Sequence, residues 1–310
     1  MVLGVDIGGT KVAAGLVDRH GRILNRSRFP MNAHGTAADG LSAVAAAIEA
    51  VRGRRHPTAI GLSSPGPLDP QRGLVLNPPN LPCWRNFPLA RAVARRFHLP
   101  VYLDNDANAA ALAEARWGAG RGFRSVFYAT LGTGIGAGLV LDGHIYHGRT
   151  GAAVEAGHVS LDPRGPLCGC GKRGCIEAFA SGPALARRAR RRVQRDPVRG
   201  RTLLRLAAGR PLASEHVAAA WRAADPLASQ LLASTADWLA MWLGTIVDLL
   251  EPEVILFGGG MGKLLAAWFP HIRRRLPEFT INSRALEIPL RAARYGAQAG
   301  IAGAAALCTP

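Results

Sequence analysis

The sequence predicts an α/β protein made of two related lobes. Residues 2–17 read as an apolar strand, a glycine-rich turn and a second apolar strand, and residues 125–141 repeat this order. Strand and helix patterns alternate after each of the two segments. A pattern that recurs within one chain is typical of related structural units. We therefore expect two related lobes whose glycine-rich turns face the same ligand.

The first half of the chain alternates between strand and helix patterns. Residues 36–51 place Leu41, Val44 and Ile48 at helical spacing, and Gly53 follows as a stop signal. The proline-rich stretches between the elements are expected to be turns and loops, because proline excludes a regular helix there. The expected strands are 2–7, 12–17, 22–29, 58–63 and 100–106, and the expected helices are 36–51, 88–97 and 107–118.

The second half contains a long helix and a third glycine-rich turn. Residues 227–250 are apolar almost all round, which predicts a buried helix. Gly258, Gly259 and Gly260 separate a strand from a helix start, a place where anions bind favourably. Residues 197–223 are expected to be a helical insertion. The remaining expected elements are strands at 125–131, 137–141, 254–257 and 287–290 and helices at 183–194 and 296–307.

The first glycine-rich turn has the composition of a phosphate-binding turn. Gly8 and Gly9 expose backbone N–H groups. Thr10 adds a hydroxyl and Lys11 a positive charge, so the turn can hold phosphate oxygens. It is not a P-loop, because no G-x-x-x-x-G-K-[ST] occurs and no helix follows the glycines. Asp6, at the end of the strand, can hold Mg²⁺ through water. A plain hairpin is the alternative.

Three cysteines and one histidine lie within a short segment: His158, Cys168, Cys170 and Cys175. They supply three sulfur ligands and one nitrogen ligand, a set that Zn²⁺ prefers. Four protein ligands leave no open position, so the metal is predicted to be structural. Disulfides are the alternative, but Cys-x-Cys is a poor spacing for one and five cysteines are an odd number. The glycines here also match a dinucleotide-binding turn, but no apolar strand precedes them.

Asp106 lies where a predicted strand meets a predicted helix. An aspartate at such a junction commonly caps the helix. Asn105 and Asp106 together indicate more, because a carboxylate held at a helix start stays ionised and can accept a proton. Asp106 is therefore a candidate general base.

The chain is strongly basic, with 38 Lys+Arg against 21 Asp+Glu and a net charge of +17. Such charge favours nucleic acid or an anionic substrate, but a GC-rich genome that encodes arginine explains it equally well. The arginine runs at 187–195 and 273–275 fall on predicted helices and are expected to be solvated faces. No aromatic residues interleave with the arginines, so no nucleic-acid partner is expected. No apolar run reaches the roughly 20 residues of a membrane span. The first residues lack the basic segment of a signal peptide, so the cytoplasm is expected.

Five motifs together resemble the ROK family of bacterial sugar kinases and repressors, within the hexokinase–actin-like ATPase superfamily. The motifs are DIGGTK (6–11), NDANAAALAE (105–114), LGTGIGAG (131–138), EAGH (155–158) and CGCGKRGCIEA (168–178). They stand in the family's order and approximate spacing, and the resemblance covers essentially the whole chain. The resemblance implies the two-lobed actin-like (ribonuclease H-like) α/β fold, with a substrate and nucleotide cleft between the lobes. The implied lobes are a small one, 1–119 plus 296–310, and a large one, 120–295.

The resemblance also implies a role for each motif. Asp106 resembles the catalytic base that acts on the sugar 6-hydroxyl. The residues similar to the family's sugar ligands are Gly66, Asn105, Asp106, Glu155, His158 and Glu177, with Asn80 as a weaker candidate. His158 would then serve both the zinc and the sugar. The residues similar to the nucleotide-binding positions are Asp6, Gly8, Gly9, Thr10, Lys11, Gly132, Thr133, Gly134, Gly258, Gly259 and Gly260.

The implied activity is phosphorylation of a hexose with MgATP, glucose to glucose 6-phosphate, in an enzyme that also holds structural Zn²⁺. Relatives of this kind are usually homodimers or homotetramers. Three alternatives stay open: a kinase for N-acetylglucosamine, N-acetylmannosamine or another hexose; inorganic polyphosphate as the donor, which would suit the arginines; and a non-catalytic sugar sensor or repressor. The family's repressors carry a helix-turn-helix before the first hairpin, which here starts at residue 2. That start and the intact Asp106 argue against the sensor.

Overall fold

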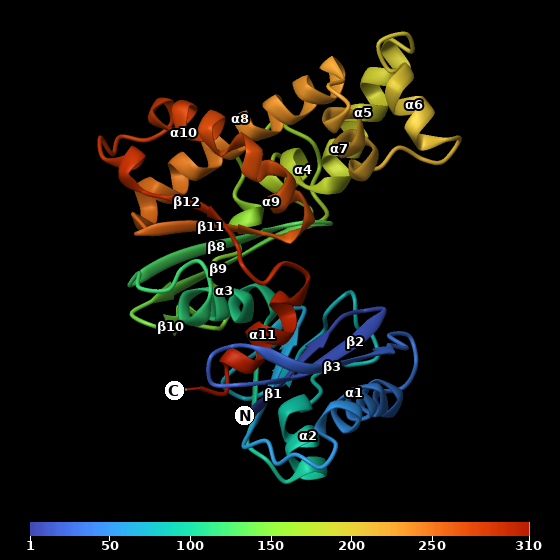
Figure 1. Cartoon of the computed structure of the whole chain (residues 1–310), viewed down its shortest axis with the longest axis vertical. Helices are drawn as coiled ribbons and strands as arrows, with labels where there is room; N and C mark the ends of the chain where they lie inside the picture. Colours follow the sequence, from blue (N-terminus) through green and yellow to red (C-terminus); the bar gives the residue numbers. More distant parts are fainter. Residues whose placement is uncertain (310) are drawn as a thin grey trace. The chain divides into compact units, whose positions relative to one another are not determined.

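The computed structural model describes residues 1–309 and combines strands and helices throughout (Figure 1). The strands are β1 (Val2–Ile7), β2 (Lys11–Val17), β3 (Ile23–Pro30), β4 (Ile60–Ser64), β5 (Leu68–Asp69), β6 (Leu74–Val75), β7 (Val101–Asn105), β8 (Ser125–Leu131), β9 (Ile135–Leu141), β10 (His144–Ile145), β11 (Val254–Gly258) and β12 (Leu290–Ala292). Within the described residues, one sheet has the order β3-β2-β1-β4-β7 and a second the order β10-β9-β8-β11-β12. Strands β5 and β6 form a short ribbon of their own.

The helices lie between and after these strands. They are α1 (Ala37–Arg52), α2 (Leu89–Phe97), α3 (Asp106–Trp117), α4 (Ile176–Ala180), α5 (Gly182–Arg195), α6 (Arg201–Ala207), α7 (Ser214–Arg222), α8 (Pro226–Leu250), α9 (Gly259–Leu265), α10 (Phe269–Arg275) and α11 (Ala299–Ala306). Helix α1 begins at a capping box between Thr36 and Asp39 and ends at Gly53. The expected insertion at 197–223 consists of α6 and α7, as predicted.

The chain divides into two compact units. The first contains residues 1–128, 138–154 and those from 293 onward, and the second contains residues 129–137 and 155–292. The first unit therefore includes segments that the sequence-based lobe boundaries assign to the large lobe. The boundaries of the two lobes stay a prediction.

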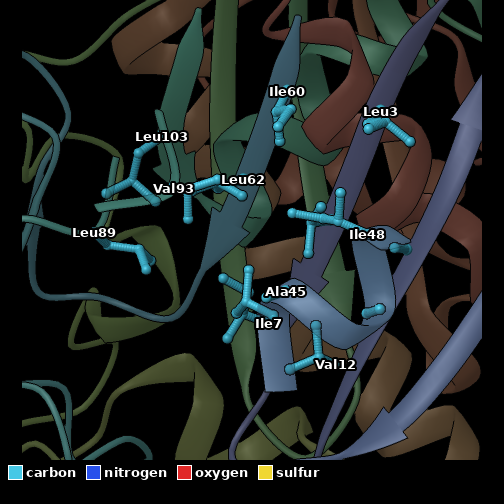
Figure 2. Packing of buried hydrophobic residues seen from close by; sticks show 14 of the residues in the cluster. Leu3, Ile7, Val12, Ala45, Ile48, Ile60, Leu62, Leu89, Val93 and Leu103 are labelled. Carbon is cyan, nitrogen blue, oxygen red and sulfur yellow. The ribbon is translucent and has the colours of Figure 1, made fainter. Parts of the chain in front are cut away.

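The core of the first unit lies between its sheet and helices α1 and α2. Strand β1 turns Leu3, Val5 and Ile7 to this side, where they are buried. Figure 2 shows the strand residues Leu3, Ile7, Ile60, Leu62 and Leu103 packed with Ala45 and Ile48 of α1 and Leu89 and Val93 of α2. Alternate residues of a strand point to opposite faces of the sheet, so every second residue of β1 lies in this core.

Helix α11 covers the opposite face of the same sheet. Gly4 of β1 and Gly61 of β4 are partners in the parallel ladder. A Cβ atom at Gly61 would lie 1.7 Å from the carbonyl oxygen of Ala304, and one at Gly4 would lie 2.0 Å from that of Ile301. The alanine-rich helix therefore packs directly on the strand backbone, because both glycines lack a side chain. The last helix of the chain therefore packs on the sheet formed by its first strands.

The second unit is organised around α8, which is buried along much of its length as predicted. Helices α4, α5, α7 and α10 pack against it. Trp242 of α8 is fully buried, and its indole N–H donates to the carbonyl of Ala156, 3.0 Å away. This bond joins the long helix to the turn that carries His158.

The strand predictions need corrections of two kinds. The last strand was expected at 287–290 but runs from Leu290 to Ala292, because Pro289 has no N–H to donate to a ladder. Its carbonyl accepts from Ile255, and pairing continues only after it. Strands β5, β6 and β10 were missed, since two residues are too few for an alternating pattern. None of the helices within residues 1–309 is both long and apolar enough to cross a membrane.

Candidate active site

Asp6, a predicted ligand of Mg²⁺, lies in a row of polar residues at the carboxyl ends of three parallel strands. Asp6, Ser63 and Asp104 are successive partners across β1, β4 and β7. The Ser63 hydroxyl donates to Asp6 Oδ1 at 3.2 Å. Burial raises the pKa of the Asp6 carboxyl, opposed by the Ser63 hydrogen bond and the charge of Lys11. Sequence analysis missed Ser63, whose only signal was its place at a strand end.

The glycine turn after β1 adjoins this row. The N–H of Gly8 donates to the carbonyl of Lys11 at 2.9 Å and closes the turn between β1 and β2. A Cβ atom at Gly9 would lie 2.6 Å from the carbonyl oxygen of Asn80, so the loop at 77–84 lies against the turn. Thr10 and Lys11 are exposed. The turn thus presents backbone N–H groups, a hydroxyl and an ammonium group to a ligand, as a phosphate site requires.

The junction of β7 and α3 carries Asn105 and Asp106. Asn105, rather than Asp106, is the N-cap: its side-chain oxygen accepts from the N–H of Ala107 at 2.8 Å. Asp106 is the first helical residue, and its Oδ1 accepts from the same N–H at 2.8 Å. Gly66 lies beside them, since a Cβ atom there would be 3.6 Å from Asn105 Nδ2. The carboxylate therefore sits in the positive field of a helix start.

The cysteine cluster lies in the second unit. The ligand atoms of His158, Cys168, Cys170 and Cys175 all lie within 4.8 Å of one another. His158 Nδ1 is 3.6 Å from the sulfur of Cys168, and the sulfurs of Cys170 and Cys175 are 3.7 Å apart. Ideal tetrahedral zinc bonds would place sulfurs about 3.8 Å apart and nitrogen about 3.6 Å from sulfur. The donor set and its spacing therefore fit zinc.

The thiols of the cluster have unequal acidities. Burial raises the pKa of the Cys168 and Cys175 thiols. The backbone N–H of Lys172 lowers the pKa of the exposed Cys170 thiol. Zinc binds the thiolate form, so a bound ion would offset the cost of ionising the two buried thiols.

Two predicted sugar ligands, Glu155 and Glu177, adjoin residues of this cluster. Glu177 of α4 accepts from the N–H of Ile135 through Oε2 at 2.9 Å, and its Oε1 is 3.6 Å from the sulfur of Cys168. The side chain thus bridges the cysteine cluster and the glycine turn at 132–134. Glu155 is exposed and accepts from the N–H of His158 through its carbonyl at 3.0 Å. Because Glu155 is exposed, its carboxylate is available to a ligand.

Two glycine-rich turns of the second unit border one large cavity. Its volume is about 830 Å³, and Gly132, Thr133 and Gly260 line it. Further lining residues, which sequence analysis missed, are Arg190, Glu215, Trp221, Arg222 and Lys263. Trp221 and Arg222 come from α7, so the insertion at 197–223 supplies one wall of the cavity. A cavity of this size suits a nucleotide, and its cations suit phosphate.

The arginine run on α5 is only partly a solvated face. Arg191, Arg192 and Arg195 are exposed, as expected. Arg188 is instead half-buried, donates to Ser234 and Thr235 of α8, and has its pKa lowered to about 10 by burial. Together the four arginines border a cavity of about 270 Å³ that shares no residue with the larger one.

The structure therefore assembles the candidate residues within each unit. In the first unit, Asn80 adjoins the glycine turn after β1 and Gly66 adjoins Asn105. In the second unit, Glu177 and His158 both contact the cysteine cluster. Gly132, Thr133 and Gly260 share a cavity there. Gly258 is buried at the end of β11, directly before the helix start.

Known proteins resemble the chain over its whole length. The model of the ROK family matches residues 2–310. The glucokinase of Streptomyces coelicolor is 37% identical over 99% of this chain and 97% of that protein. The N-acetylmannosamine kinase of Salmonella arizonae is 34% identical over 98% and 97%. The structure of a ROK family glucokinase from Streptomyces griseus in complex with glucose and AMPPNP matches with a TM-score of 0.84 at 38% identity, covering 99% of this chain and 98% of that one. The predicted α/β actin-like fold class is confirmed, and the chain belongs to the ROK family.

Proposed function

We propose that this protein is an ATP-dependent hexose kinase that phosphorylates the 6-hydroxyl of glucose. The observation that carries the proposal is the carboxylate of Asp106 at the start of α3, beside the amide of Asn105. The family relationship to glucokinases supports the same activity. A general base next to hydrogen-bonding groups is what transfer to a sugar hydroxyl requires.

The reaction needs one proton transfer and one phosphoryl transfer. The hydroxyl oxygen of the sugar bonds to the γ-phosphorus while the bond from that phosphorus to ADP breaks. Asp106 accepts the hydroxyl proton. Because the transition state is loose, the protein mainly positions the reactants and stabilises charge.

The sugar hydroxyls are proposed to bind side chains already described. Asn105 offers an amide, and Glu155 and Glu177 offer carboxylates that accept from hydroxyl groups. His158 offers its second ring nitrogen, because its Nδ1 faces Cys168. Gly66 leaves the space beside Asn105 open.

The nucleotide is proposed to occupy the 830 Å³ cavity, with its phosphates at the turn of Gly132 and Thr133 and its adenosine toward Gly260. Lys11, the hydroxyl of Thr10 and the N–H of Gly9 are proposed to hold phosphate oxygens, while the N–H of Gly8 keeps the turn closed through the carbonyl of Lys11. Asp6 offers the carboxylate oxygens that Mg²⁺ prefers, and the ion would neutralise phosphate charge when bound.

The cavity assignment predicts that Trp221→Ala weakens nucleotide binding. Removal of an aromatic wall should raise the KM for ATP about tenfold, since base stacking on an aromatic ring is worth roughly 1–3 kcal/mol. The KM for glucose should stay unchanged. Steady-state kinetics with each substrate varied in turn measure both. Leu204→Ala is the matched control, because Leu204 is exposed on α6 of the same insertion and lines no part of this cavity. A shift in the glucose KM alone would contradict the assignment.

We also propose that His158, Cys168, Cys170 and Cys175 hold a structural Zn²⁺. Tetrahedral spacing of the donor atoms supports this. The segment that carries these ligands, residues 158–175 (the zinc segment), also positions Glu177, because Cys168 contacts that carboxylate. The ion would therefore shape the sugar site without entering the chemistry.

The backbone of the zinc segment predicts a sharp difference between two glycine variants. Gly174 has a φ of 69°, and a Cβ atom there would lie 1.7 Å from the carbonyl oxygen of Asp162. Gly174→Ala should therefore lose zinc and about 3 kcal/mol of unfolding free energy. Gly169→Ala is the control, because nothing lies within 4 Å of its added methyl group. Metal analysis measures the zinc content, and urea unfolding measures the unfolding free energy. Equal zinc content and equal unfolding free energy in the two variants would refute the packing argument.

The site of phosphorylation can be tested with sugar analogues. The proposal predicts that 6-deoxyglucose binds as a competitive inhibitor and is not phosphorylated, because it lacks the attacking hydroxyl. Turnover of 6-deoxyglucose would contradict the role assigned to Asp106.

The second candidate substrate is an N-acetyl sugar. The relationship to N-acetylmannosamine kinases favours it, at 34% identity over nearly the whole chain. Every catalytic role above would be kept, and only the space beside the 2-position would differ. A homodimer or homotetramer is also proposed, and light scattering on the purified protein tests it.

A further inference from the structure

Asp104, one residue before Asn105, forms an ion pair with His147. The Nε2 atom of His147 lies 2.6 Å from Asp104 Oδ2. The side chain of Asp104 is only 4% exposed, whereas that of His147 is 33% exposed. His147 follows β10 and is separated from Asp104 by 43 positions. A buried carboxylate needs such a partner, because an unpaired charge in the interior is costly.

The other oxygen of Asp104 holds the turn that carries Asp106. Oδ1 accepts from the backbone N–H of Asn105 at 2.7 Å and from Asn108 Nδ2 at 3.1 Å. Both donors lie at the start of α3 or directly before it, on either side of Asp106. The buried carboxylate of Asp104 therefore holds the turn between β7 and α3 through two hydrogen bonds. His147 holds that carboxylate in place through a third.

We propose that His147 is a positioning residue for catalysis: through Asp104 it holds the β7–α3 turn in the geometry in which Asp106 accepts the sugar's proton. This inference rests on the proposed function, in which Asp106 is the general base. Supporting residues of this kind matter because a displacement of about 1 Å can lower a rate about 100-fold.

Solvent reaches the pair through a cavity of about 580 Å³ that both side chains line. The other titratable or charged groups on its walls are Tyr102 of β7, Arg116 of α3, His144 of β10 and Arg72 between β5 and β6. The guanidinium of Arg116 donates a hydrogen bond to the carbonyl of Ala306 at 2.8 Å. Among the described lining residues Asp104 is the sole carboxylate, so it is the only anion in the cavity wall that can pair with His147.

This arrangement makes the support sensitive to pH. The hydrogen bond to Asp104 raises the pKa of His147 above its ordinary value. Below that pKa the histidine is charged and the bond is charge-assisted. As pH rises through it, the charge is lost and a weaker neutral hydrogen bond remains. The contribution of the ion pair is therefore present on the acid side and lost on the alkaline side.

His147→Gln tests this directly, because glutamine keeps a neutral N–H donor and does not titrate in this range. The measurement is kcat and both KM values for wild type and variant, from about pH 5.5 to about pH 9, on either side of the ordinary histidine pKa. We expect the ratio of wild-type to variant kcat to be about tenfold at the acid end and to fall toward unity as pH rises. The KM for ATP should not change.

His144→Gln is the matched control. His144 lines the same cavity, but its ring contacts the carbonyl of Asp142 and not Asp104. It should keep the wild-type pH profile. A ratio for His147→Gln that is the same at every pH, or equal to that of His144→Gln, would overturn the proposal.

Folding failure can be separated from failure of the proposal. Asp104→Asn/His147→Gln replaces both charges with neutral amides, so no charge is left unpaired. This double variant should fold and lose the pH-dependent part of kcat; if it keeps that part, His147 is not its source. Melting curves test the pair without activity: the difference in melting temperature between wild type and His147→Gln should shrink as pH rises. If the wild type phosphorylates no sugar, the proposed function fails, whereas a constant difference in melting temperature contradicts the ion pair itself.

Discussion

Asp106→Asn should lower kcat by about 10²- to 10⁴-fold, the range typical of general acid–base catalysis. In the wild type, the N–H of Ala107 donates to Asp106 Oδ1 at 2.8 Å. Asparagine keeps the shape of the side chain and an oxygen that can accept this bond. It cannot accept the hydroxyl proton. The fold and most of the glucose affinity should therefore survive. Steady-state kinetics and calorimetric titration with glucose measure the two quantities.

A surface aspartate provides the control for this prediction. Asp196 follows α5, and its carboxylate accepts from the N–H of Arg199 at 3.0 Å, a bond that asparagine can also make. Asp196→Asn should keep normal turnover. Near-normal turnover of Asp106→Asn would mean that the proton goes elsewhere.

Loss of zinc should produce the second large effect. Structural zinc contributes on the order of 10 kcal/mol in small zinc peptides. Cys170→Ala removes one ligand and should lose zinc and glucose affinity together, because Cys168 of the same cluster contacts Glu177. Elemental analysis should find one zinc ion per wild-type chain and almost none in the variant.

Cys83→Ala is the control for the metal prediction, since Cys83 packs against the core of the first unit and is no part of the cluster. It should keep both zinc and glucose affinity. A wild-type protein that contains no zinc and takes up none on titration would show that the cluster is not a zinc site.

Local patterns were enough to predict most of the fold. The strands β1 and β2 and the helices α1, α3 and α8 follow from apolar periodicity and from start and stop signals near them. The exceptions depended on contacts along the chain or across it. Strand β12 starts late because of Pro289, and the two-residue strands β5, β6 and β10 are too short to show a period and form only through pairing with other strands.

The residues of the candidate site likewise fall into those that the sequence could predict and those that it could not. Asp106 and the cysteine cluster could be found because their residue types and spacing are local. The wall of the nucleotide cavity could not, because Trp221 and Arg222 reach it only through the packing of α7. His147 was missed for the same reason, since nothing near it in the sequence indicates a bond to Asp104.

The most direct test of the central claim is a coupled phosphorylation assay on the zinc-loaded protein. It should cross glucose, mannose, fructose, N-acetylglucosamine and N-acetylmannosamine with ATP and inorganic polyphosphate as donors. The account predicts turnover with ATP and the highest kcat/KM for glucose. Preference for an N-acetyl sugar would change the substrate assignment but keep the catalytic roles. Activity with polyphosphate would give the arginines a part in donor binding. The absence of turnover with every pair would contradict a hexose kinase and favour a sugar sensor.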